Sequence, residues 1–187
     1  MTEKTIVAGF GGQGIMFLGK VLAQAAMDAG HHVTYIPSYG PEVRGGKANC
    51  HVVVSSEEID SPLAVCADAV LAMSQIAWDF FAPRLAPEGL AVVNSSMVSA
   101  GDAAEGGAQR VVAVPATALA DGLGDVRVTN MIMLGAYNRA RGLLAPEVLL
   151  ASLRMALAGP KAKLFDLNRR ALEQGIEAAE AARCGAE

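Results

Sequence analysis

The chain has 187 residues, of which 52% are hydrophobic and 18% are charged, and its formal net charge at pH 7 is -4. This length and composition suit one domain, residues 1–187, with a sizeable apolar core. An acidic chain without a basic run gives no electrostatic reason to expect nucleic acid or a membrane surface as a partner. Residues 1–4 enter a strand directly, and no stretch has the roughly 18 apolar residues that span a bilayer, so we expect a cytoplasmic protein.

The three cysteines, Cys50, Cys66 and Cys184, are scattered singly along the chain. A four-cysteine iron–sulfur cluster therefore cannot be built from this chain alone. Cys50 and His51 are adjacent, but neighbouring side chains of a strand point to opposite faces, so the two are not expected to ligate one metal. We expect both to be ordinary core or strand residues.

Strand-like and helix-like segments alternate through the first part of the chain. A strand at residues 5–8, a helix that ends near residue 29 with Gly30 as its stop, and a strand at 32–36 form a predicted β-α-β unit. Further short apolar or β-branched runs predict strands at 49–55, 69–73, 90–94 and 111–114. Such runs are typical of strands covered on both faces, so we expect a mostly parallel sheet flanked by helices.

The last third of the chain is predicted to be helical, after an exposed loop over residues 99–109. The predicted helices are 131–141 capped by Asn130, 147–158 opened by Pro146, and 164–182 after a break at Gly159-Pro160. Apolar residues of the last helix recur every three or four positions, and we expect this face to pack on the sheet, with docking on a partner as the alternative. The predicted fold class is α/β, a single Rossmann-like domain with a helical C-terminal third.

A first glycine cluster lies where the first strand turns into the first helix. Its candidate binding residues are Gly9, Gly11, Gly12, Gln13 and Gly14. Backbone amides and a helix N-terminus at such a turn can hold a phosphate or a partner's carboxylate. The spacing Gly-x-Gly-x-x-Gly also matches the dinucleotide-binding pattern.

A dinucleotide site needs an acidic residue at the end of the second strand to hold the ribose hydroxyls. That strand here ends in Ile36-Pro37-Ser38, without a carboxylate. Ser38 and Arg44 would hold a 2′-phosphate only if Arg44 folded back across a Gly-Pro turn. An independent NAD(P) site is therefore the less favoured interpretation.

A second glycine cluster follows the second strand. Its candidate residues are Ser38, Tyr39, Gly40, Pro41, Glu42, Arg44, Gly45 and Gly46. Gly40-Pro41 predicts a turn, and the adjacent glycines leave backbone amides uncovered, so the loop can grip an anion or a neighbouring subunit. Alternatively, Glu42 and Arg44 simply neutralise each other on a solvated surface.

These residues together resemble the gamma subunit of the 2-oxoacid:ferredoxin oxidoreductases, most closely the 2-oxoglutarate type, and the match covers essentially the whole chain. The specific part is the stretch Tyr-Gly-Pro-Glu-Val-Arg-Gly-Gly at 39–46. The other matching segments are 9–15 with Gly19-Lys20, Ala48-Asn49, Asn130 with Gly135-Ala136, and the segment from Leu167-Asn168 to Gly175.

The resemblance implies one subunit of an enzyme that oxidatively decarboxylates a 2-oxoacid to an acyl-CoA and passes the electrons to ferredoxin. Thiamine pyrophosphate, Mg²⁺ and the iron–sulfur clusters would reside on alpha, beta and delta (ferredoxin-like) partner subunits. This chain would contact coenzyme A or a partner through residues 38–46. No catalytic residue is assigned, and the isolated chain is expected to be inactive.

Several alternatives remain open at the level of the sequence. The substrate can be 2-oxoglutarate, which the glycine loop favours, or else pyruvate or a branched-chain acid. The chain can be a free-standing nucleotide-binding oxidoreductase, or a purely structural subunit whose glycine turns pack against protein. An apolar helix face without its partner would also give the isolated chain a reason to form a homodimer.

Overall fold

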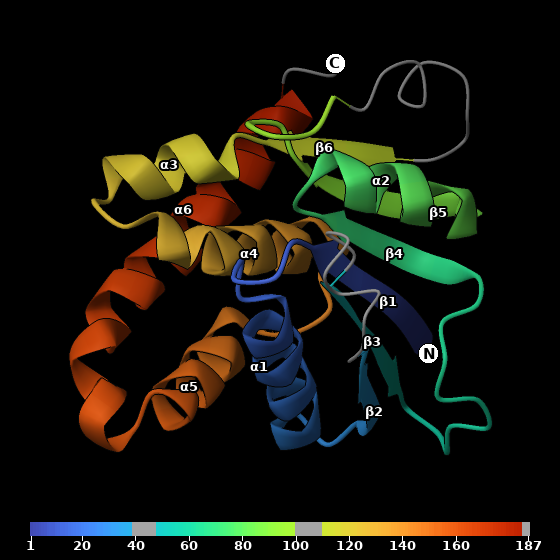
Figure 1. The fold of residues 1–187 in the computed structure, drawn as a ribbon. Helices are drawn as coiled ribbons and strands as arrows, with labels where there is room; N and C mark the ends of the chain where they lie inside the picture. The colour runs from blue at the N-terminus through green and yellow to red at the C-terminus, as the bar shows by residue number, and fades with distance from the viewer. Residues whose placement is uncertain (39–47, 100–109, 185–187) are drawn as a thin grey trace.

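The computed structural model describes residues 1–38, 48–99 and 110–184. A sheet with the strand order β2-β3-β1-β4-β5-β6 forms the centre of this part of the chain (Figure 1). Its strands are β1 (Thr2–Gly9), β2 (His32–Pro37), β3 (Ala48–Ser55), β4 (Ala67–Ala72), β5 (Leu85–Asn94) and β6 (Arg110–Val114).

The sheet is mostly parallel, as expected from the sequence, but one strand is reversed. β1, β4, β5 and β6 pair in parallel, whereas β3 pairs antiparallel with both β1 and β2. The predicted β-α-β unit therefore forms without direct pairing of its two strands, because β3 lies between them. Only residues 38–47 connect β2 to β3, and so short a connection suits a reversal better than a helical crossover.

Helices cover both faces of the sheet. They are α1 (Ile15–Asp28), α2 (Gln75–Phe81), α3 (Ala116–Gly122), α4 (Thr129–Arg141), α5 (Pro146–Ala156) and α6 (Phe165–Cys184). One face of the sheet joins an apolar cluster with α1, α4, α5 and α6, and the other packs against Trp78 and Phe81 of α2. No helix in the described segments is long and apolar enough to cross a membrane.

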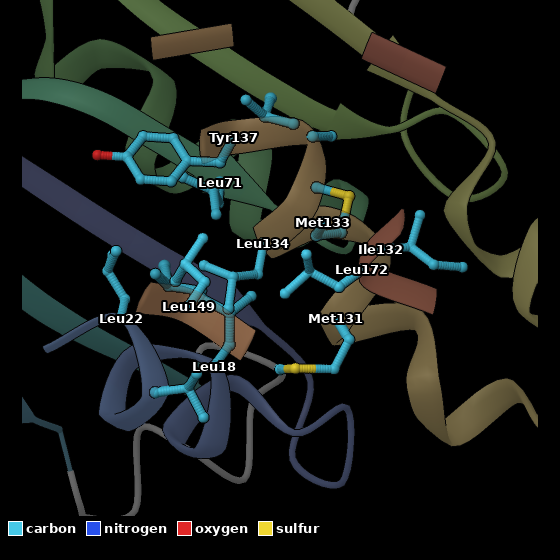
Figure 2. Packing of buried hydrophobic residues seen from close by; sticks show 14 of the residues in the cluster. Leu18, Leu22, Leu71, Met131, Ile132, Met133, Leu134, Tyr137, Leu149 and Leu172 are labelled. Carbon is cyan, nitrogen blue, oxygen red and sulfur yellow. The ribbon is translucent and has the colours of Figure 1, made fainter. Parts of the chain in front are cut away.

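Helix α4 is buried along most of its length, because every residue from Thr129 to Asn138 is buried. In Figure 2 its side chains meet those of α1 and α6. The face of α6 that was predicted to pack on the sheet contacts β6 but packs mainly on α4. A Cβ atom on Gly135 would collide with the backbone of Leu172, and one on Gly175 with the backbone of Ile132, so these two glycines let the helix axes approach closely.

A polar cluster joins the end of α4 to the start of β1. Glu3 is 4% exposed, and its carboxylate accepts hydrogen bonds from Arg141 Nε at 2.8 Å and from the Tyr137 hydroxyl at 3.2 Å. The Tyr137 hydroxyl also lies 2.8 Å from Thr5 Oγ1. Burial raises the pKa of Glu3 although Arg141 favours its charged form. The cluster supplies a partner for each of these buried polar groups, which would otherwise be costly.

Cys50 and His51 lie on opposite faces of β3, as predicted. Cys50 is fully buried in the larger cluster, where desolvation raises the pKa of its thiol to about 12. His51 faces the other side, and its Nδ1 accepts a hydrogen bond from the buried amide of Ala64 at 3.1 Å. Burial and the positive charge of Arg84 lower the pKa of His51, so the neutral imidazole is the form that the fold needs.

The substitution Gly175→Ala should destabilise the protein by about 3 kcal/mol, near the upper end of overpacking costs, although alanine favours helices. The reason is the collision of its Cβ with the Ile132 carbonyl. Urea unfolding followed by circular dichroism measures the effect. Gly122→Ala is the control, because a Cβ there meets no atom within 4 Å; equal losses in the two variants would contradict close packing of α4 on α6.

Acidification from pH 7 to pH 5 should weaken the fold through His51. A pKa lowered in the folded state means that the stabilisation is present above the unfolded pKa of 6.5 and is lost as the pH falls through the folded value. The free energy of unfolding, measured across this range, should fall less in His51→Gln, whose amide oxygen can still accept from Ala64. An unchanged pH profile in that variant would show that His51 is not responsible.

Candidate anion-binding site

The first glycine cluster forms the turn between β1 and α1, at the carboxyl edge of the parallel strands. Gly12 and Gly14 have φ angles of 94° and 73°, which lie in the left-handed region that favours glycine. The Gly14 carbonyl accepts the first hydrogen bond of α1, from the Leu18 amide at 3.0 Å. The turn thus requires glycine at both positions to lead from strand into helix.

Gln13 holds this turn against the neighbouring strand. Its Oε1 accepts a hydrogen bond from the Phe10 amide at 2.7 Å, and its Nε2 donates to the carbonyl of Met73, just after β4, at 3.1 Å. A Cβ atom on Gly9 would lie 2.5 Å from Gln13 Oε1 and 2.8 Å from Ile15 Cδ1. Gly9 and Gln13 therefore shape the turn through contacts within the chain.

Gly14 packs against Asn130 of α4. Asn130 Nδ2 donates to the Gly14 carbonyl at 3.1 Å, and a Cβ atom on Gly14 would collide with the Asn130 amide group. The prediction that Asn130 caps its helix is wrong, because α4 begins at Thr129 with Val128 in the capping position. Asn130 instead lies in the first turn of α4, where its Nδ2 donates to Gly14 and its Oδ1 accepts from the Met131 amide at 2.9 Å.

Gly11 and Gly12 differ from the other glycines of the turn because they face open space. Both are exposed, and a Cβ atom on either would meet none of the described residues' atoms within 4 Å. No side chain of the described segments caps the N-terminus of α1, and its first turn has no acidic residue. The partial positive charge of the helix end therefore reaches the same open surface, which suits an anion.

A pocket of about 230 Å³ lies beside this open backbone. Its lining residues are Gly12, Gln13, Met97, Thr117, Val126, Arg127 and Thr129. Arg127 is held by Asp125, whose carboxylate accepts from Arg127 Nε at 2.9 Å and from Nη2 at 2.6 Å. These hydrogen bonds lower the pKa of Asp125 to about 2. Arg127 was not predicted as a site residue. The only local signal in the sequence is an aspartate two positions earlier.

The ends of the second glycine loop lie at the same edge of the sheet. Ala48 is the register partner of Gly9, and the Ser38 amide donates to the Asn49 carbonyl at 2.9 Å. The structure thus brings Ala48 beside the end of β1, with Ser38 one strand further along the same edge. The other candidates lie outside the described residues: Tyr39, Gly40, Pro41, Glu42, Arg44, Gly45 and Gly46. Residues 100–109, which belong to the predicted exposed loop, also lie outside the described residues.

The strand order bears on the dinucleotide interpretation. In that fold the strand after the first helix pairs with the first strand, which brings its acidic residue close to the glycine turn. Here β3 intervenes, so the end of β2 lies two strand spacings from β1, roughly 10 Å away. Together with the absence of a carboxylate among residues 35–38, this argues against a ribose-binding arrangement of that type.

The described part of the chain is an α/β domain, with a six-stranded sheet flanked by helices and a glycine turn at one edge. Residues 4–178 match the family described as pyruvate ferredoxin/flavodoxin oxidoreductase. The chain belongs to this family, which confirms the resemblance found in the sequence.

Curated relatives include subunits of two different oxoacid enzymes. The ketoisovalerate oxidoreductase subunit VorA of Methanothermobacter thermautotrophicus is 41% identical over 173 residues, which cover 91% of this chain and 35% of the relative. The chain therefore spans about a third of the length of that relative. The 2-oxoglutarate synthase subunit KorC of Methanothermobacter marburgensis is 36% identical over 150 residues, with 78% of this chain and 81% of the relative covered.

Solved structures share the fold. The gamma subunit of a keto/oxoacid ferredoxin oxidoreductase from Geobacter sulfurreducens aligns with a TM-score of 0.80 and 28% identity, covering 96% of this chain and 99% of that one. A 2-oxoglutarate:ferredoxin oxidoreductase from Magnetococcus marinus, solved with 2-oxoglutarate, coenzyme A and succinyl-CoA bound, aligns with a TM-score of 0.86. That alignment covers 96% of this chain and 31% of the other, and at 24% identity it supports the fold alone.

The substitution Gln13→Glu should lower the free energy of unfolding at neutral pH by about 1–3 kcal/mol. A carboxylate keeps the acceptor for Phe10 but places an oxygen without a proton beside the Met73 carbonyl. The loss should shrink below about pH 4, where a protonated carboxyl can donate again. Denaturant unfolding at both pH values checks this, with the exposed Ala151→Glu as the control for added charge; a pH-independent loss would contradict the assignment.

Proposed function

We propose that this chain is the gamma subunit of a multi-subunit 2-oxoacid:ferredoxin oxidoreductase. The complex would oxidatively decarboxylate a 2-oxoacid to the acyl-CoA and pass the electrons to ferredoxin. Family membership supports the class of enzyme, and the relatives that match are named as subunits of such enzymes. Residues 1–187 would form one gamma-type domain of this assembly.

The observation that carries the role of this chain is the open backbone at Gly11 and Gly12. The space beside both glycines is open among the described residues, the end of α1 has no side-chain cap, and Gly12 and Arg127 line one pocket. A phosphate group of coenzyme A fits these donors, because backbone amides and arginine are the usual partners of phosphate oxygens. Bound coenzyme A would supply the thiol that accepts the acyl group.

The second glycine loop extends this proposed surface. Ser38 and Ala48, its described flanks, lie at the edge where Gly9 ends β1. We propose that residues 38–46 face coenzyme A or the adjoining subunit, with Arg44 pairing with an anion. Gly9, Gln13 and Gly14 contribute by holding the turn, as their contacts within the chain indicate.

Catalytic groups would come from partner subunits. The chain has three cysteines, too few for a four-cysteine cluster, and the thiol of Cys50 is buried with a strongly raised pKa. Thiamine pyrophosphate with Mg²⁺ and the iron–sulfur clusters would therefore be held by alpha, beta and delta (ferredoxin-like) subunits. This chain would bind and orient, and would transfer no proton itself.

The substrate is 2-oxoglutarate or a branched-chain 2-oxoacid in this proposal. The sequence favoured 2-oxoglutarate, but the VorA relative is more identical than the KorC relative. Both substrates therefore belong in the same assay. The cytoplasmic location and the homodimer of the isolated chain stay predictions.

Affinity purification of this chain from its native host tests the proposal. We expect thiamine-binding and cluster-bearing subunits to co-purify, with CoA-dependent reduction of methyl viologen by 2-oxoglutarate or by ketoisovalerate. The preferred acid identifies the substrate. A chain that purifies alone and binds NAD(H) or NADP(H) would instead support the free-standing oxidoreductase. A complex whose activity is unchanged by substitutions in the glycine turn would support a purely structural subunit.

The substitution Gly11→Val distinguishes a subunit that binds coenzyme A from a purely structural subunit within the purified complex. A side chain there fills open space without touching the fold, but it covers the amides offered to the anion. The KM for coenzyme A should rise by about tenfold or more, as expected when a charge-assisted hydrogen bond is lost, while the KM for the oxoacid stays the same. Gly122→Val, at an equally open position, should change neither constant.

A further inference from the structure

A second pocket, of about 210 Å³, is lined in part by Arg127, which also lines the first pocket, and by Asn130, which donates to Gly14. Its other lining residues come from α1, the 3-10 turns Val126–Val128 and Gly159–Leu164, and the neighbouring ends of α5 and α6. Its lining residues are Phe17, Asp125, Arg127, Val128, Asn130, Leu157, Lys161, Leu164, Leu167 and Asn168. Half of these residues are apolar, and the other half are charged residues or asparagines.

The apolar part of the lining offers a hydrophobic floor. Val128 and Leu157 are buried, and Phe17, Leu164 and Leu167 are half-buried. The volume is below the 300–1,000 Å³ of pockets for drug-sized ligands and corresponds to about seven water molecules. The pocket therefore suits a compact apolar group of a few carbon atoms.

The charged groups at the pocket leave one net positive charge. Asp125 and Arg127 neutralise each other, since Nε and Nη2 of Arg127 both donate to the Asp125 carboxylate. Lys161 has no ion pair among the described residues. The Lys161 ammonium and the remaining Nη1 of Arg127 are thus the groups that can bind an anion here.

The wall of the pocket also contains two buried amides. Asn130 and Asn168 are 4% and 8% exposed, and Asn168 Nδ2 donates to the Leu164 carbonyl at 2.8 Å. The Nδ2 donors of both amides are used within the chain, since Asn130 Nδ2 donates to the Gly14 carbonyl at 3.1 Å. These amides therefore shape the wall, and Lys161 with Nη1 of Arg127 are the polar groups that can reach a ligand. An apolar floor with a few convergent polar groups is typical of a small-molecule site.

We propose that this pocket binds a small amphipathic monoanion, which has a compact aliphatic body and a single carboxylate or phosphate group. The body would lie on the apolar floor, and the anionic group would pair with Lys161 and with Nη1 of Arg127. The proposal requires neither coenzyme A nor a partner subunit, although Arg127 also lines the pocket beside the glycine turn.

Titration of the full-length chain, followed by two-dimensional NMR, tests the proposal. The probes are 4-methylpentanoate and 3-methylbutyl phosphate, which distinguish a carboxylate from a phosphate ester. We expect one of them to bind with an affinity of about millimolar, as suits a ligand of this size, and to shift the signals of Leu164 and Leu167. Acetate and 4-methylpentanamide, which lack the body and the charge respectively, should bind much more weakly.

Two charge reversals provide matched variants, since Lys161 and Lys163 are exposed residues of the same 3-10 turn but only Lys161 lines the pocket. Lys161→Glu should weaken binding by about tenfold or more, and Lys163→Glu should change it only slightly through long-range charge. Unaltered circular dichroism of both variants confirms that they fold.

Three results would overturn the proposal. Binding of acetate or of the amide as tight as that of the full probe would remove the need for an amphipathic anion. Equal weakening by the two lysine variants would indicate a diffuse electrostatic effect. Absence of binding, combined with loss of co-purifying protein in Lys161→Glu alone, would make the pocket a contact for a partner's side chain.

Discussion

Helix α4 is fastened at both ends, and the candidate site depends on this attachment. Asn130 at its start donates to the Gly14 carbonyl, and Arg141 at its end pairs with the buried Glu3 of β1. Removal of one partner from a buried ion pair typically costs about 3–5 kcal/mol. Between these ends the helix is buried, and the glycines Gly135 and Gly175 bring α6 against it. The position of the glycine turn is therefore set by contacts from the far end of the sequence.

This attachment explains why the glycines of one cluster have different roles. Gly9 and Gly14 are required because Gln13 and Asn130 occupy the space that a Cβ would need. Gly11 and Gly12 have no such neighbour among the described residues. A side chain at position 11 would therefore be compatible with the packing of the fold. Backbone left bare where the fold has room for a side chain is best explained by something that approaches from outside.

Much of the fold could be predicted from the sequence, because periodicity and glycine stops are local signals. The strand at residues 49–55 was predicted, but its antiparallel direction was not. An apolar run buried on both faces has the same pattern in either direction, so it does not indicate which way the strand runs. Asn130 was assigned to a helix cap for a similar reason. A local rule describes the nearest backbone, whereas the Asn130 side chain also donates to a carbonyl 116 positions away.

The site was predictable only as far as its backbone motif. The turn carries a spacing that sequence alone displays, whereas Arg127 and Lys161 reach their pockets through the packing of α4, α5 and α6, which no spacing records. The resulting surface consists of backbone amides, a helix end and the Arg127 guanidinium, which Asp125 holds. Amides do not titrate and arginine stays protonated, so such a surface binds anions over a wide pH range but has no group that would exchange a proton near pH 7. A chain built in this way is suited to hold a charged group in place while reactive groups elsewhere in an assembly act on it, and this is the division of labour in the proposed complex.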